Sequence, residues 1–142
     1  MGFFAGLVSF YLLTWLASLV LPTGTIPAGM AGIAAAAIMF VTVGIAHFAK
    51  PEKLEAMIPE AWPYKRAANY ISGLVEIACG IALLFAATRI YAAWALIALL
   101  VFIFPANIHV AMKKPDGYNI SRLFFQPVYI AWIWWFCITA TR

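Results

Sequence analysis

Few side chains in this 142-residue sequence combine chemical reactivity with a place in or beside a long apolar stretch. We take five of them as the candidate site: His47, Glu76, Asn107, Arg122 and Gln126. Polar groups are costly inside a bilayer, so such positions are the first place to look for function. Histidine and glutamate could handle protons. Asparagine, arginine and glutamine could orient the carbonyl groups of a ligand by hydrogen bonding.

The composition explains why these side chains stand out. Hydrophobic residues make up 66% of the chain and charged residues 10%, whereas a soluble domain has about 45–50% and about 25%. Too few polar residues remain to cover a soluble globule, and the same hydrophobicity excludes disorder. The net charge is +4, but the nine lysines and arginines are spread over several loops, which argues against nucleic-acid binding. We therefore predict one membrane domain over residues 1–142.

Five apolar stretches have the length of roughly 20 residues that a helix needs to cross a bilayer. They cover about residues 3–21, 28–49, 70–88, 90–112 and 123–139, and the fourth passes through Pro105. The polar alternation of barrel strands is missing. Backbone groups in lipid must be satisfied within their own segment, so the stretches are predicted to be helices. The predicted fold class is all-α, a membrane bundle of five transmembrane helices.

The positive charges predict how this bundle lies in the membrane. If all five stretches cross, one side receives Lys50, Lys53, Lys65, Arg66, Lys113, Lys114 and Arg122, and the other receives Arg89 and Arg142. We therefore expect the N-terminus in the cytoplasm and the C-terminus outside, in the cytoplasmic membrane of a bacterium or archaeon. No lysine or arginine precedes the first apolar stretch, so we expect this helix to be retained rather than cleaved as a signal peptide.

The connection after the second stretch predicts a short helix on the inner membrane surface. Pro51 suits the first turn of a helix, and Glu52 suits its positive end. Leu54, Met57 and Ile58 would share one apolar face, as in a helix that lies in the interface.

Glu76 is the sharpest single feature, because it lies six residues beyond the predicted start of its helix. At ~1.5 Å per residue it is about 9 Å deep, where a carboxylate stays protonated or takes a cationic partner. His47 and Arg122 are the candidates. Gly73 and Gly80 share its face and would admit a neighbouring helix or a flat ligand. Three interpretations stay open: a pair that clamps helices, a ligand-binding or proton-handling carboxylate, and a side chain that reaches to the lipid interface.

Two further polar residues follow Pro105, which removes a backbone hydrogen bond and should kink the fourth helix. Asn107 and His109 lie about 200° apart on a regular helix. We therefore expect Asn107 in the interior, on a ligand or on freed backbone groups, and His109 among the lipid headgroups. Trp132 and the two tryptophans after it are expected in an outer aromatic belt or at a partner. The two histidines and Glu76 share no helix-turn spacing, so no metal site is predicted.

The order of several short strings is similar to that of the DoxX-like family of small integral membrane proteins. The strings are Gly44-Ile45-Ala46-His47-Phe48, Ser72-Gly73-Leu74-Val75-Glu76-Ile77 and Phe104-Pro105-Ala106-Asn107-Ile108, followed by Arg122 and Gln126. The resemblance covers about residues 30–136. It implies a four-helix core at about 28–139, with the helix at 3–21 as an addition, and it raises a quinone-linked redox role. Phe124-Phe125 departs from the family, which often has proline before the glutamine.

We therefore expect a membrane subunit or accessory of a quinone-linked redox system, which binds a lipid-soluble ligand at a cytoplasmic-side polar cluster. The glycine-lined helix face would admit the ligand's tail. The sequence has no haem ligand pair, flavin motif or iron–sulfur cysteines, so a quinone is the expected cofactor and a redox partner is required. The alternative is a structural accessory subunit that packs against a larger membrane protein complex or as a homo-oligomer, with the polar cluster as internal helix glue.

Overall fold

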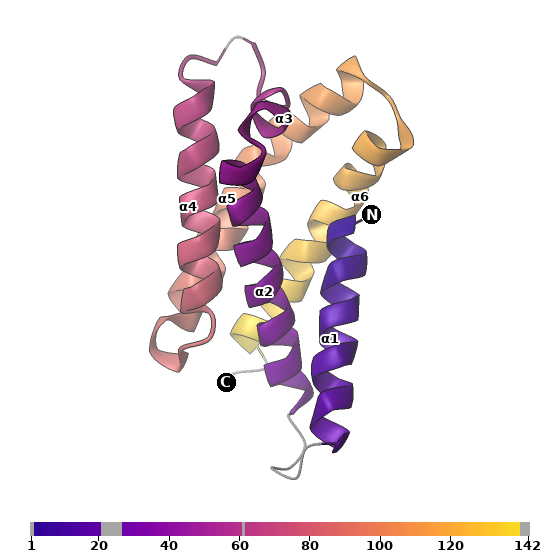
Figure 1. The fold of residues 1–142 in the computed structure, drawn as a ribbon, viewed down its shortest axis with the longest axis vertical. Coiled ribbons are helices and arrows are strands. Elements are labelled where there is room, and N and C mark those ends of the chain that lie inside the picture. Colours follow the sequence, from indigo (N-terminus) through magenta and orange to yellow (C-terminus); the bar gives the residue numbers. More distant parts are fainter. Residues whose placement is uncertain (1, 21–26, 61, 140–142) are drawn as a thin grey trace.

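The computed structural model describes residues 2–20, 27–60 and 62–139, and every regular element in these ranges is a helix (Figure 1). The elements are α1 (Gly2–Val20), α2 (Ala28–Ala49), α3 (Pro51–Glu55), α4 (Lys65–Ala82), α5 (Ala86–Lys113) and α6 (Gly117–Ile133), which continues as a π-helix (Trp134–Thr139). The all-α prediction is confirmed. The predicted end of the first helix at Leu21, and Arg142, lie outside the described residues.

Two of these helices, α2 and α5, are long and apolar enough to cross a membrane. The apolar part of α1, Phe4–Ala17, is shorter. α4 carries three charged residues, Lys65, Arg66 and Glu76, and α6 is 17 residues long and contains Arg122. By length and composition, the described part of the chain thus has two candidate membrane spans, fewer than the five that were predicted.

α4, α5 and α6 begin earlier than predicted. For α4 and α6 the reason is that their polar first turns look like loop in the sequence. α4 begins at Lys65 rather than at residue 70, and α6 begins at Gly117 rather than at residue 123. The start of α6 is capped by Asp116, whose side chain accepts a hydrogen bond from the backbone N–H of Asn119 at 2.8 Å. An N-terminal aspartate cap of this kind satisfies a backbone donor that the helix leaves unpaired.

Arg89 lies inside a helix and not in the outer loop where the sequence placed it. α5 begins at Ala86, and the buried Arg89 reaches back to the end of α4. Its Nε donates to the carbonyl of Leu83 at 2.8 Å, and its Nη2 donates to that of Leu84 at 3.4 Å. A cation at a helix C-terminus satisfies carbonyls that have no partner within the helix. Arg89 therefore closes the turn between α4 and α5.

α2 and α4 approach each other through facing glycines. A Cβ atom added at Gly73 would lie 2.5 Å from the Cβ of His47 and 2.9 Å from the carbonyl oxygen of Gly44. One added at Gly80 would lie 3.1 Å from the carbonyl oxygen of Ala37. These contacts are all with α2, so α2 fills the glycine-lined face of α4. The prediction that this face admits the tail of a ligand is therefore wrong.

α1 is part of the bundle and not an appendage to it. Its Leu7 is buried in the hydrophobic core, and its Tyr11 packs edge-on against Trp132 with the ring centroids 5.6 Å apart. The Trp132 indole N–H donates to the carbonyl of Gly32 on α2 at 3.1 Å. Trp132 thus packs inside the bundle rather than in the predicted outer belt. The two tryptophans after it are exposed.

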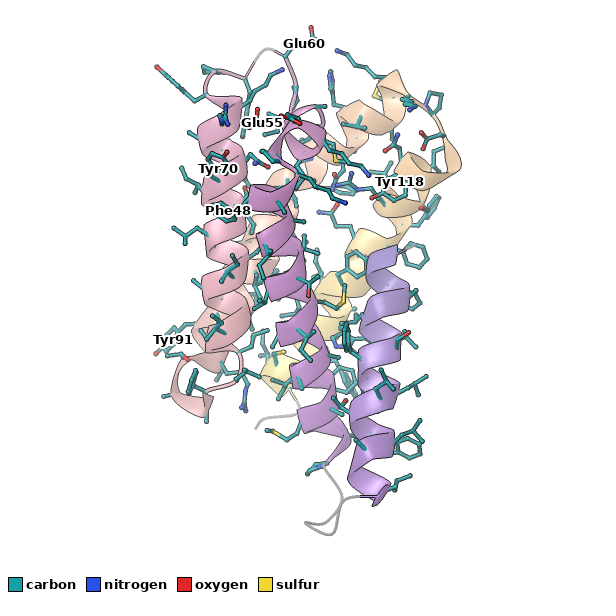
Figure 2. All side chains as sticks on the ribbon, viewed as in Figure 1. Phe48, Glu55, Glu60, Tyr70, Tyr91 and Tyr118 are labelled. Carbon is teal, nitrogen blue, oxygen red and sulfur yellow. The ribbon has the colours of Figure 1, made fainter. Side chains whose placement is uncertain are left out.

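The bundle has two distinct ends. α3, the C-terminal end of α5 and the N-terminal end of α6 lie at one end, and the turn between α4 and α5 lies at the other (Figure 1). Figure 2 shows Glu55 and Glu60 at the α3 end and Tyr91 toward the opposite end. The seven basic residues that the sequence assigns to one side lie in, or directly beside, elements that meet at the α3 end.

Candidate functional site

A cavity of about 1050 Å³ lies at the α3 end of the bundle, and all five candidate residues line it. They come from four helices: His47 from α2, Glu76 from α4, Asn107 from α5, and Arg122 and Gln126 from α6. Most of the remaining lining is apolar or aromatic. The structure thus brings together residues that are up to 79 positions apart in the sequence (126 − 47 = 79).

The partner of Glu76 is His47 and not Arg122. The Oε2 atom of Glu76 lies 3.3 Å from Nε2 of His47, and Glu76 is buried. This separation exceeds the ~2.7–2.9 Å of a charge-assisted hydrogen bond. Oε2 has no hydrogen-bond partner of good geometry among the described residues. The pair joins α2 to α4, as the clamp interpretation expects.

Asn69 holds the imidazole of His47 in one orientation. The Asn69 amide nitrogen donates to the backbone carbonyl of His47 at 2.9 Å, which leaves its Oδ1 facing Nδ1 of His47 at 2.7 Å. Since Oδ1 can only accept, Nδ1 carries the proton. The other nitrogen, Nε2, faces the Glu76 carboxyl group. One further proton is therefore needed between these two groups, on either His47 or Glu76, for their contact to be attractive.

A second chain of hydrogen bonds joins α6 to α5. Arg122 Nη2 donates to Asn107 Oδ1 at 2.8 Å, and Asn107 Nδ2 donates to Gln126 Oε1 at 2.8 Å. The Gln126 amide nitrogen then donates to the backbone carbonyl of Leu100. Gln126, rather than Asn107, thus bonds the α5 backbone near Pro105. The chain fixes the orientation of both amides and of the guanidinium group.

α3 and the residues after it cover the cavity. The predicted apolar face of Leu54, Met57 and Ile58 lines the cavity. Met57 accepts a hydrogen bond from Arg122 Nη1 at its sulfur, 2.7 Å away. The ring of Trp62 packs at a tilt against that of Phe102 on α5, with the ring centroids 5.6 Å apart. The segment therefore closes the α3 end of the bundle over the site.

An exposed ion pair ties the same segment to the end of α5. Lys113 Nζ donates to Glu60 Oε1 at 3.0 Å. This hydrogen bond and charge, together with the charge of Lys65, lower the pKa of Glu60 below its ordinary 4.5. A carboxyl group whose pKa is lower in the folded chain than in the unfolded chain stabilises the fold at pH values above the ordinary pKa. This stabilisation is lost as the pH falls through the lowered pKa of the folded chain. Because both side chains are exposed, the contribution to stability is small.

His109 also lines the cavity, although the sequence placed it among the headgroups. Its Nε2 atom is buried and has no hydrogen-bond partner among the described residues. The angular argument against it failed because the segment with Trp62 folds over α5, so a second side of that helix faces the cavity. Tyr118 and Tyr129 were missed as well. Their spacing with Arg122, at four and seven residues, places all three near one helix face and could have revealed them.

The sequence model of one protein family, described as Domain of unknown function (DUF8561), matches residues 36–137. No curated protein and no solved structure matches the chain. The resemblance to the DoxX-like family is therefore wrong, because the matching family is a different one. The strings that carried it consist largely of glycine, proline and single polar residues. Glycine and proline are frequent in membrane helices in general, and the quinone-linked role that rested on these strings has lost its support.

Proposed function

The chain belongs to the DUF8561 family, whose function is unknown, and on that premise we propose a function from the cavity itself. The proposed function is that of an integral membrane protein that binds a lipid-soluble ligand at the α3 end of its bundle. The polar head of the ligand contacts the cluster of His47, Glu76, Asn107, Arg122 and Gln126, and its apolar part lies among the surrounding side chains.

The outer surface supports a membrane location for all five long helices. Large apolar side chains are exposed on α1, α4, α5 and α6 as well as on α2, for example Leu13, Leu74, Trp94, Phe124 and Ile45. A soluble monomer rarely exposes so many apolar groups. The basic residues gather at the α3 end, which supports an orientation with this end and the N-terminus in the cytoplasm and the C-terminus outside.

The size of the cavity carries the ligand-binding proposal. A site that held helices together and nothing else would be packed to the density of a protein interior. Here about 1050 Å³ stays open beside the polar cluster, which is just above the roughly 300–1,000 Å³ of small-molecule sites. A mostly apolar wall with a few convergent polar groups is also the usual form of such sites. Internal helix glue accounts for the hydrogen bonds but not for this volume.

A larger side chain in the cavity wall should displace the ligand. Ala106 on α5 lines the cavity, and Ala95 on the same helix is exposed and does not. We expect the wild-type protein and Ala95→Phe, purified from their host membranes in mild detergent, to retain one lipid-soluble species near equal stoichiometry. Ala106→Phe should lose most of it. Mass spectrometry of organic extracts measures the amounts, and gel filtration checks that both variants are folded. Equal retention by the two variants would contradict the proposal.

A further inference from the structure

We propose that the ligand carries an anionic headgroup and that Arg122 binds it; this inference rests on the proposed function. The first step is the charge balance of the cavity, which four ionisable groups other than tyrosine line: His47, Glu76, His109 and Arg122. Glu76 lies 3.3 Å from His47. Arg122 has no carboxylate within 4.0 Å among the described residues. The cavity therefore contains a cation with no counter-charge from the protein.

The guanidinium group of Arg122 has hydrogen-bond donors that the protein does not use fully. It has five N–H donors, all of which seek acceptors when they are removed from water. Nη2 donates to Asn107 Oδ1, and Nη1 donates to the thioether sulfur of Met57, which is a weak acceptor. No described residue accepts from Nε. Arg122 is partly buried in a mostly apolar wall, where unused donors and an unpaired charge are costly.

Arg122 is already held in position by its neighbours. Its bond to Asn107 is the first link of the chain through Gln126 to the backbone of α5. On another side, the ring of Tyr118 lies 5.9 Å from the guanidinium carbon. A cation with a fixed orientation binds an anion without first losing conformational freedom. Carboxylate and phosphate oxygens are the groups that a guanidinium binds best, through paired N–H bonds.

Two kinds of lipid supply such oxygens, a fatty-acid carboxylate and the phosphate of a phospholipid. The test uses oleate, dioleoyl phosphatidic acid and the uncharged oleyl alcohol, and measures their binding to the delipidated full-length protein in a nonionic detergent at alkaline pH. We expect at least one of the two anions to bind at least about tenfold more tightly than the alcohol, which corresponds to about 1.4 kcal/mol. Preference for oleate identifies a carboxylate ligand, and preference for phosphatidic acid identifies a phosphate ligand.

Arg122→Gln should reduce this preference to about twofold or less, because one charge-assisted interaction is lost. Arg66→Gln, at an exposed arginine outside the cavity, should keep the full preference. Arg122→Lys retains the charge, so it should keep part of the preference and serves where the glutamine variant does not fold. Equal binding of all three lipids to the wild-type protein would contradict the proposal that the ligand is anionic, but not the proposal that the cavity binds a lipid-soluble ligand. Failure of every lipid to bind would overturn the proposed function as well.

Discussion

Gly73→Ala is expected to destabilise the bundle by about 3 kcal/mol, the upper end of the usual cost of overpacking. The added Cβ would lie 2.5 Å from the Cβ of His47 and 2.9 Å from the carbonyl oxygen of Gly44. Neither atom belongs to the flexible end of a side chain, so α2 and α4 must move apart. This movement would also weaken the contact between His47 and Glu76. Unfolding in mixed micelles with increasing dodecyl sulfate measures the change in free energy.

The matched control is Gly117→Ala at the start of α6, where nothing lies within 4 Å of the added Cβ. This variant should change the free energy of unfolding by no more than about 0.5 kcal/mol, as surface substitutions usually do. If the two variants were equally stable, the close approach of α2 and α4 would not contribute to the stability of the fold.

His47→Leu is expected to cost about 3–5 kcal/mol, the usual result of removing one partner of a buried charge pair. The substitution leaves the buried Glu76 without the imidazole that faces it, and it leaves Asn69 Oδ1 without its donor. The same micellar unfolding experiment measures the loss.

His109→Leu provides the comparison, since both histidines line the cavity. The buried Nε2 atom of His109 has no hydrogen-bond partner among the residues that the structure describes. Its replacement by an apolar side chain should therefore be neutral or stabilising. Similar losses for the two variants would show that His47 contributes by filling space and not by pairing with Glu76.

The sequence was sufficient to predict the helices but not where they begin. Long apolar stretches require a helix in lipid, and each of the five contains one. A polar first turn has no such signature. Lys65 is the first residue of α4 and Asp116 caps α6, yet both residue types are just as common in loops. Gly73 and Gly80 indicated that something packs closely against one face of α4. Whether a helix or a ligand occupies this face depends on how α2 and α4 are rotated about their axes.

The candidate site was predicted as a set of residues but not as a set of contacts. Consecutive long helices run in opposite directions, so polar residues near the end of one helix lie beside polar residues near the start of the next. This arrangement brings His47 and Glu76 to the same end of the bundle. Pairing depends on the rotation of each helix about its axis, which a nearly uniform apolar sequence leaves open. For this reason Arg122 remained a partner candidate for Glu76. Asn69, seven residues before Glu76, lies on the same face and could have been recognised as part of the site.

The central claim, that the cavity holds a lipid-soluble ligand, is tested most directly by photolabelling. An oleyl alcohol with a diazirine in its chain is irradiated with the wild-type protein in liposomes, and the labelled peptides are mapped by mass spectrometry. We predict saturable labelling at the cavity-lining residues within 99–109 and 118–129, and its suppression by excess unlabelled oleyl alcohol. Labelling of exposed residues such as Leu13 on α1 should not be suppressed. Labelling of the two ranges that is no more saturable than that of α1 would contradict the claim.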